Sequence, residues 1–578
     1  MKKLLRYLKN YKLECAIAPS FKMLEALFEL FVPLVMTKII DDGIKAANRS
    51  VVYHNGMILV LLGVIGLTCS LTAQFFAARA AIGFSKGVRS DLYKKIMSFS
   101  HENIDKLGAS SLITRMTNDI NSVQNGVNMV LRLLLRSPFI VFGAMIMAFT
   151  INVKAAIVFT VIIPVLFAVV MFITFSTIPK YKAIQKKLDA LTLHVRENLS
   201  GARVIRAFDA ADDEENDFAA DNDSFLKMNR LTAGISALLN PATLILVNLA
   251  LMVVIWQGGN FVYEGILTSG MVVALINYMS QILIELVKLT NLFVTINKAL
   301  ASGSRIAATL EENSALCDDG TLDAGDCKSA SSVVSFDNVS FKYPEAMSES
   351  LENISFSINK GETVGIIGGT GSGKTTISNL IMRFYDVTEG EIKVFGNPIK
   401  AYSLSSLRKC ISYVPQKAQL FTGTIKDNLI LGNKDASDDT IAEALRISEA
   451  KEIVEKKEGK LEYVLTEAGA NLSGGQRQRL TIARALCEEN SLLILDDSSS
   501  ALDYATDARL RANLKNMSDK LTTIIISQRI VSVKGADKII VLDDGHLAGI
   551  GTHDELLKTS EVYKEIVASQ QKNEEDAV

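Results

Sequence analysis

Apolar residues are concentrated in the first three hundred positions of this chain, in runs long enough to cross a lipid bilayer. A membrane-spanning helix needs about 20 predominantly apolar residues. Six stretches meet that requirement, at about 14–39, 55–82, 128–150, 153–178, 234–257 and 266–290. The third and fourth meet at Ile151-Asn152-Val153, which predicts a tight external turn. We therefore predict an α-helical polytopic membrane domain with six transmembrane helices over residues 1–310.

Lysine and arginine placement predicts the orientation of these helices. Both residues are frequent at the N-terminus, in 86–106 and in 180–206, whereas 258–269 contains neither. Because cytoplasmic loops carry the excess of positive charge, the first three segments are expected inside and the last outside. The first stretch is too long and too charged for a cleaved signal peptide. We expect a multi-pass protein of the cell membrane, the plasma membrane of a bacterium, with its C-terminal half in the cytoplasm.

Composition agrees with this organisation. The 578 residues are 49 % hydrophobic, with a mean hydropathy of +0.24 and a net charge of −2, which gives no indication of a nucleic-acid partner. Residues 311–332 are acidic and then rich in Ser and Ala, without an apolar period, and predict a linker. Residues 333–578 then form a second domain. The six cysteines show no metal-ligand spacing, so free thiols are expected.

A phosphate-binding loop lies near the start of this second domain. Gly368–Thr375 matches G-x-x-x-x-G-K-[ST], after a strand-like run and before a helical pattern. In this motif backbone N–H groups surround phosphate oxygens, Lys374 neutralises the β and γ groups, and the Thr375 hydroxyl binds Mg²⁺. We predict α/β P-loop ATPase chemistry with ATP and Mg²⁺. The predicted ATP-binding residues of the loop are Gly368, Gly369, Thr370, Gly371, Ser372, Gly373, Lys374, Thr375 and Thr376.

A second motif narrows the assignment. About a hundred residues after the loop the chain reads Leu-Ser-Gly-Gly-Gln, and then an apolar run, 492–496, ends in Asp496. This combination resembles the ATP-binding cassette (ABC) family, in which the pentapeptide is the signature and Asp496 would be the Walker B carboxylate at Mg²⁺. The signature residues are Leu472, Ser473, Gly474, Gly475 and Gln476. In the family they bind the nucleotide that the opposite cassette holds.

The resemblance implies roles for further residues. Gln416 would be the Q-loop residue, touching the metal and the membrane domain, and Tyr343 would stack on adenine. Asp503 lies in a stretch that resembles the D-loop, and 466–469 resembles the X-loop of exporters. The cytoplasmic stretches 99–119 and 196–208 resemble the two loops whose short coupling helices dock on the cassettes in family exporters. The alternative, without a coupling function, is that these stretches are solvated extensions of long helices.

Two positions depart from the family pattern. Asp497 stands where the family has the glutamate that polarises the attacking water, and Gln528 replaces a histidine that contacts the γ-phosphate. The aspartate side chain is shorter than that of glutamate, so its carboxylate lies farther from the attacking water. A misplacement near 1 Å can cost about a hundredfold in rate. Together with the intact signature, these changes resemble the degenerate half of a heterodimeric exporter. The chain would bind ATP at its own site and turn it over slowly.

One set of six helices with one cassette is half of a transporter, so a second half-transporter is required as partner. The resemblance implies ATP-driven export of lipophilic drugs, lipids or peptides from the cytoplasm or inner leaflet. A homodimeric exporter and an importer with exporter architecture remain open alternatives. A soluble family ATPase of DNA repair or translation is excluded by six membrane spans.

Ionisable residues within the first apolar stretch suggest a substrate site. Lys22, Glu25 and Glu29 are spaced i, i+3, i+7 and share one helix face. Such groups inside a membrane span usually face a cavity or a partner rather than lipid. We hypothesise that Glu25 or Glu29 favours cationic substrates. The alternative is a Lys22–Glu25 pair near a helix end that only satisfies itself.

Overall fold

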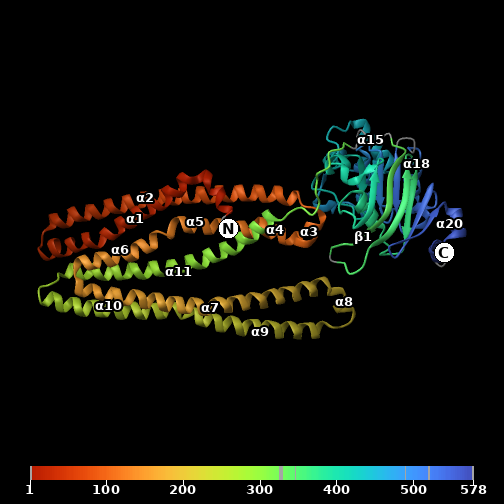
Figure 1. Ribbon diagram of the computed structural model, residues 1–578. Helices are drawn as coiled ribbons and strands as arrows, with labels where there is room; N and C mark the ends of the chain where they lie inside the picture. The colour runs from red at the N-terminus through yellow and green to blue at the C-terminus, as the bar shows by residue number, and fades with distance from the viewer. Residues whose placement is uncertain (1–2, 324–329, 345, 489, 518–520, 576–578) are drawn as a thin grey trace. The chain divides into compact units, whose positions relative to one another are not determined.

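The chain forms two compact units. The computed structural model describes residues 3–323, 330–344, 346–488, 490–517 and 521–575. The helical unit comprises Met1–Ser98 and Ala109–Glu312, and the α/β unit comprises Phe99–Gly108 and Asn313–Val578. Long helices make up the first unit and the sheets lie in the second (Figure 1). A segment between two membrane-type helices therefore belongs to the α/β unit.

Long helices dominate the helical unit, and several carry short 3₁₀ or π segments at their ends. The elements are η1 (Leu4–Tyr11), α1 (Lys12–Lys38), η2 (Ile39–Lys45), α2 (Arg49–Met97), α4 (Ala109–Thr114), η3 (Arg115–Asp119), α5 (Ile120–Leu133), α6 (Arg136–Ile151), α7 (Val153–Ser200), α8 (Ala202–Ala207), α9 (Ala211–Ala237), α10 (Leu239–Tyr263) and α11 (Ser269–Glu311). The helices α7 and α9 pack along one another and are connected through α8 (Figure 1).

Five helical segments among the described residues are long and apolar enough to span a membrane. They are Arg49–Met97, Ala109–Ile151, Val153–Ser200, Ala211–Tyr263 and Ser269–Glu311, and they contain the second to fifth predicted stretches and most of the sixth. The first predicted stretch forms α1, which is not among the five because Lys22, Glu25 and Glu29 lie in its middle. A helix is thus present at each of the six predicted stretches, and α1 differs from the others in its charge.

Small residues let the helices of this unit approach closely, as is typical of helix packing in membranes. The buried face of α1 includes Ala18 and Ala26, and α2 buries Ala73 and Ala77. The tight turn predicted after Ile151 is present. There the Asn152 side chain accepts a hydrogen bond from the backbone N–H of Ala155, 3.1 Å away, and so caps α7.

Two main sheets form the α/β unit. The antiparallel sheet has the order β2-β1-β4-β5, and the second sheet has the order β12-β11-β3-β10-β9-β6, parallel except for β12. The strands are β1 (Ser332–Phe341), β2 (Leu351–Asn359), β3 (Thr363–Gly368), β4 (Glu389–Val394), β5 (Asn397–Pro398), β6 (Ile411–Val414), β7 (Gly423–Thr424), β8 (Val464–Leu465), β9 (Leu492–Asp496), β10 (Thr522–Ile526), β11 (Lys538–Asp543) and β12 (His546–Gly551).

Helices cover these sheets and form a separate lobe around α15. They are α12 (Lys374–Ile381), α13 (Leu404–Lys409), α14 (Ile425–Leu429), α15 (Asp438–Ile447), α16 (Lys451–Glu455), α17 (Gly474–Leu486), α18 (Tyr504–Lys515), α19 (Ile530–Val533), α20 (His553–Thr559) and α21 (Glu561–Glu575), with short helical turns η5 (Ile399–Ala401), η6 (Lys460–Glu462) and η7 (Glu467–Gly469). Each residue of β9 and β10 is buried. Such continuously buried strands are expected where a parallel sheet is covered on both faces.

The predicted linker is partly attached to the α/β unit. Residue 311 still belongs to α11. Farther along, Leu322 forms a bridge with Tyr402, and the Asp318 carboxylate accepts a hydrogen bond from the backbone N–H of Leu404 at 2.7 Å. Residues 324–329 of the linker lie outside the described residues. The acidic composition predicts a connecting segment but does not show that part of it is held by hydrogen bonds.

The segment of the α/β unit that lies far away in sequence is α3 (His101–Leu107). Ser100 and Asn103 form a capping box at its start, which satisfies N–H groups that would otherwise lack partners. The His101 ring stacks on Phe384 with centroids 4.2 Å apart, and the Tyr385 hydroxyl donates to Asp105 at 2.6 Å. The helix predicted in the first cytoplasmic loop is thus packed on the residues that follow α12.

Close packing of α5 on α11 generates a stability prediction. A Cβ added at Gly126 would lie 2.3 Å from the Ala299 Cβ, whereas one at Gly66 of α2 would meet nothing within 4 Å. We expect Gly126→Ala to destabilise the protein by about 1–3 kcal/mol through overpacking. Gly66→Ala should be neutral or stabilising by up to about 1 kcal/mol, since alanine favours helix. Thermal unfolding of both variants in detergent measures the difference, and equal melting temperatures would contradict the α5–α11 contact.

Candidate functional site

The phosphate-binding loop joins β3 to α12, as its sequence context predicts. Gly371 and Gly373 have φ angles of +86° and +89°, a region that side chains with a Cβ rarely adopt. At Gly373 a Cβ would also lie 2.7 Å from the carbonyl oxygen of Ser350. These two glycines are therefore required by the backbone path, which turns the start of α12 toward the carboxyl end of β3.

Lys374 is the buried cation of this loop. Its Nζ donates to the carbonyl oxygen of Gly368 at 3.0 Å, to that of Gly369, and to the Ser372 hydroxyl at 3.3 Å. Burial lowers the pKa of Lys374, while the charges of Asp497 and Asp496 act in the opposite direction. The ammonium thus lies inside the loop, close to two carboxylates, in a position to neutralise a polyanion.

Asp496 ends β9 at the centre of the site. It is fully buried and accepts hydrogen bonds from the hydroxyls of Thr375 at 3.1 Å, Ser378 at 3.0 Å and Tyr413 at 3.2 Å. Burial raises the pKa of Asp496 despite these bonds, and neighbouring Asp497 raises it further. A buried carboxylate beside a second one is poorly compensated by hydroxyl donors alone, so the pair favours an additional cation.

Asp497 follows on the same strand end with a φ of +44°. Gln416 donates from Nε2 to Asp497 Oδ2 at 3.3 Å, and the backbone N–H of Asp497 donates to the carbonyl oxygen of Ile526 at 2.8 Å. Burial raises the pKa of Asp497, with the hydrogen bond from Gln416 opposing it. The three residues Gln416, Asp497 and Gln528, predicted to be catalytic, line the same pocket.

This pocket has a volume of about 310 Å³. It is lined by Tyr343, Ser350, Thr370, Gly371, Gly373, Lys374, Thr375, Thr376, Gln416, Asp496, Asp497, Ile526 and Gln528. Of the predicted loop residues, Gly368, Gly369 and Ser372 do not line it but hold the Lys374 side chain from behind. The parallel pairing of β3, β10 and β9 explains the convergence, because ligand-binding residues gather at the carboxyl ends of parallel strands.

Tyr343 lies at one side of the pocket within an aromatic cluster. Its ring meets Phe341 and Tyr385 edge-on, with centroids 4.8 and 5.1 Å away, and its hydroxyl accepts a hydrogen bond from Asn379 at 3.2 Å. Tyr385 is also the residue that bonds Asp105 of α3. The ring predicted to stack on adenine is therefore connected through one aromatic neighbour to α3.

The signature and the D-loop residue lie outside this pocket. Ser473 caps α17, its hydroxyl accepting from the backbone N–H of Gln476 at 3.3 Å while the Gln476 side chain accepts from the Ser473 N–H. Ser473 and Gly474 are exposed, whereas Leu472 is buried. Asp503 caps α18 through the backbone N–H and the hydroxyl of Thr506. The signature thus presents an exposed helix N-terminus, where backbone N–H groups favour anions.

Sequence reasoning missed several residues that support the site. Ser378 and Tyr413 hold Asp496, and Ser350 and Ile526 line the pocket. From α21, Gln570 accepts from the backbone N–H of Ile530 at 2.8 Å and donates to the carbonyl oxygen of Gln528 at 2.7 Å. Ser378 could have been found, since it follows Lys374 by one helical turn. No local sequence pattern predicts the contribution of Gln570, which lies near the end of the sequence.

Oxygen donors at the pocket suit a hard cation. The Thr375 hydroxyl and the Asp496 carboxylate lie 3.1 Å apart, and Gln416 lines the same pocket. Mg²⁺ prefers such oxygen ligands and is usually held by one or two carboxylates together with substrate phosphates. Within the described residues no group of three or more His, Cys, Asp or Glu side chains could hold a metal alone. The site therefore fits a magnesium ion that arrives with a nucleotide.

Glu25 and Glu29 lie in the helical unit, apart from this pocket. Lys22 Nζ and Glu25 Oε2 are 2.6 Å apart, so the pair that the alternative interpretation predicted is present. Arg136 of α6 adds ion pairs with both glutamates, at 3.9 Å to Glu25 and 2.7 Å to Glu29. The prediction treats both carboxylates as available to a substrate, whereas in the structure each has an ion pair with this arginine.

Comparisons with known proteins agree with the arrangement of the two units. A family model described as "ABC transporter transmembrane region" matches residues 16–286, and one described as "ABC transporter" matches residues 351–500. The first match includes α1, together with the longer helices up to the middle of α11. The two matches therefore cover parts of both units.

Relatives match over nearly the whole chain. The "Uncharacterized ABC transporter ATP-binding protein YfiB" of Bacillus subtilis is 36% identical over 99% of this chain and 98% of its own length. The "Probable multidrug resistance ABC transporter ATP-binding/permease protein YheI" of the same organism is 31% identical over 99% of this chain and 97% of its own.

The fold matches a solved exporter. A structure of a bacterial Atm1-family ABC exporter with ATP bound superposes with a TM-score of 0.80, covering 96% of this chain and 99% of that chain at 22% identity. Two family matches, full-length relatives and a shared exporter fold lead to one conclusion. The chain belongs to the ABC transporters, as a transport ATPase with an exporter-type transmembrane domain fused to its ATP-binding domain.

Proposed function

We propose that this chain is one subunit of a heterodimeric exporter of lipophilic compounds and carries its degenerate ATP site. The observation that carries the proposal is Asp497 at the pocket, where family cassettes have glutamate. Its carboxylate hydrogen-bonds Gln416. Aspartate is one methylene shorter than glutamate, so the base is withdrawn from the position of the attacking water. Because a misplacement near 1 Å costs about a hundredfold, hydrolysis at this site is slow.

Gln528 supports the same interpretation. A glutamine keeps a hydrogen-bond donor toward the γ-phosphate but cannot take up or release a proton near neutral pH. The site therefore binds ATP, with Lys374, Thr370 and Thr375 at the phosphates and Tyr343 on the adenine. Thr375, Asp496 and Gln416 would hold Mg²⁺, which supplies charge neutralisation for the phosphates.

The intact signature gives the chain its second role. Ser473 and the N–H groups of Gly474 and Gly475 form an exposed helix start, suited to the γ-phosphate held by a partner cassette. The chain thus completes the partner's ATP site while its own turns over slowly. Closure of the two cassettes around ATP drives alternating access, transmitted through α3 and the loop around α8.

Substrate class and direction are inferred from the fold and from a named relative. The exporter-type fold and a relative named for multidrug resistance favour outward movement of drugs, lipids or other lipophilic compounds. In vesicles whose cassettes face outward, an exporter accumulates substrate when ATP is added, whereas an importer does not. That experiment tests export against import, and copurification of a second chain tests the heterodimer against the homodimer.

Nucleotide binding at this chain's own site is expected to depend on Lys374. Lys374→Ala removes the buried cation near the phosphates, so photolabelling of this chain by an azido-ATP should fall at least tenfold, because charge-assisted hydrogen bonds contribute about 1.5–3 kcal/mol. Lys393→Ala serves as control, since that lysine lies on β4 and pairs with Asp337. Labelling of Lys374→Ala at the wild-type level would contradict the assignment of the pocket.

The asymmetry of the two sites makes a second prediction. In the assembled transporter, Asp497→Asn should change steady-state ATPase activity less than twofold, because the base is already set back. Ser473→Ala, far from this chain's own pocket, should reduce activity at least tenfold by removing a γ-phosphate ligand from the working site.

The reverse ranking would refute the heterodimer. In a homodimer with equal sites Asp497 is the candidate base of both sites, and removing a general base costs about 10²–10⁴ in rate. Lys393→Ala again serves as control, because that lysine lies on β4 and pairs with Asp337.

A further inference from the structure

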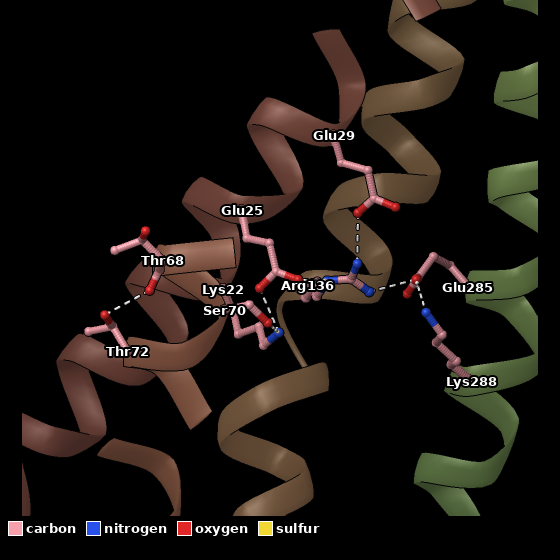
Figure 2. Close-up of polar contacts among 9 residues, drawn as sticks. All are labelled: Lys22, Glu25, Glu29, Thr68, Ser70, Thr72, Arg136, Glu285 and Lys288. Atoms are coloured by element: carbon pink, nitrogen blue, oxygen red, sulfur yellow. Dashed lines mark hydrogen bonds and ion pairs between the residues drawn. The ribbon is translucent and has the colours of Figure 1, made fainter. Parts of the chain in front are cut away.

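Six charged residues form one connected cluster inside the helical unit (Figure 2). Glu29, Arg136, Glu285 and Lys288 follow one another with alternating charge, and Glu25 and Lys22 branch from Arg136. Three helices of the unit contribute: α1, α6 and α11. Three carboxylates face three cations, so the cluster is neutral as a whole and is cheaper to hold in a membrane than its members would be separately.

Arg136 occupies the centre. It is the first residue of α6, directly after the break at residues 134–135 that separates α5 from α6, and only 7% of it is exposed. Nη1 donates to Glu285 at 2.6 Å and Nη2 to Glu29 at 2.7 Å. Glu285 is buried and also accepts from the Ser137 hydroxyl and from Lys288. The negative charge of Glu285 is thus better compensated than that of the other two carboxylates, and its ion pair with Arg136 is retained.

Glu25 is committed to a structural pair. Lys22 is buried and donates to Glu25 at 2.6 Å and to the Ser70 hydroxyl of α2 at 3.0 Å. The nearby hydroxyls of Thr68 and Thr72 bond carbonyl oxygens of their own helix (Figure 2). Removing the Glu25 charge would leave Lys22 buried without its counter-ion, which is strongly destabilising.

Glu29 differs from the other two carboxylates. Its side chain is 40% exposed, against 17% for Glu25 and 3% for Glu285. Within the described part of the chain its one ion pair is with Arg136, a cation that it shares with the other two glutamates. An ionised side chain in a membrane helix faces a polar cavity or a partner rather than lipid. Glu29 is therefore an accessible and incompletely compensated negative charge.

The guanidinium of Arg136 also has one N–H donor without an acceptor in the part of the chain that the structure describes. Arg136 Nε is buried and has no hydrogen-bond partner among the described residues, and Glu25 Oε1 lies 3.9 Å from it. A small rotation toward Glu25 would give this donor an acceptor. Leaving Glu29 therefore costs Arg136 less than losing an ion pair outright, because an uncompensated buried donor is satisfied in exchange.

We propose that Glu29 recognises the positive charge of a lipophilic organic cation, which displaces Arg136 from it, while Arg136 turns to Glu25. Arg136 thus acts as a built-in cation that keeps Glu29 paired between transport cycles. Glu25 is a positioning residue and does not touch the substrate. This inference rests on the proposed export of lipophilic compounds and names a substrate class for it.

The test uses the transporter purified through a tag on this chain, with the chain that copurifies, in vesicles whose cassettes face outward. Tetraphenylphosphonium and tetraphenylborate have the same shape and opposite charge, so ATP-driven uptake of both separates charge from size. Wild type should prefer the phosphonium. Glu29→Gln should raise its half-saturating concentration about tenfold, as expected for one charge-assisted contact, and abolish the preference. Glu29→Asp should give a half-saturating concentration between those of wild type and Glu29→Gln.

Glu14→Gln is the matched control. Glu14 lies on the same helix and pairs with Arg79 at 3.5 Å, about 22 Å from Glu29 at 1.5 Å per helical residue. The Glu14→Gln variant should leave uptake of both ions unchanged. Unchanged phosphonium uptake by Glu29→Gln, an equal loss of both ions, or a wild type that prefers the borate would overturn the proposal. A wild type that accumulates neither ion would instead overturn lipophilic export itself, together with this site.

Discussion

The parallel register of three central strands is the constraint on which the ATP site depends. β10 pairs with β3 on one side and with β9 on the other, which sets Ile526 opposite both Ile366 and Asp496. The phosphate loop, the two carboxylates and Gln528 consequently leave the sheet at one edge. Burial at this edge raises the pKa of both carboxylates.

Structural elements with a local sequence signal could be predicted, whereas the residues that support the site through distant contacts could not. The loop, its strand and helix, and Asp496 follow from short motifs whose geometry is set by neighbouring residues. Tyr413 and Gln570 act through contacts across the domain, so no window of sequence reveals them. In the helical unit, hydropathy located a helix at each of six stretches but could not show that α1 is held by charges.

The cluster around Arg136 illustrates the same limit. Spacing on one helix placed Lys22, Glu25 and Glu29 on a common face, which the structure retains. Their principal partner comes from α6, more than a hundred residues later, at a helix break that hydropathy smooths over. The Arg136 guanidinium forms ion pairs with three carboxylates, and the distances to each decide which one is structural and which is accessible. Those distances exist only in the folded protein.

The position of α3 has a consequence for modularity. Its residues lie between two membrane-type helices in sequence, yet His101 and Asp105 contact the aromatic residues after α12. The ATPase domain is thus discontinuous in the gene. A recombination that exchanged only the C-terminal half with that of a relative would separate Phe384 and Tyr385 from the helix they fit. Exchange of cassettes during evolution therefore requires compatible changes in a short segment encoded near the other end of the chain.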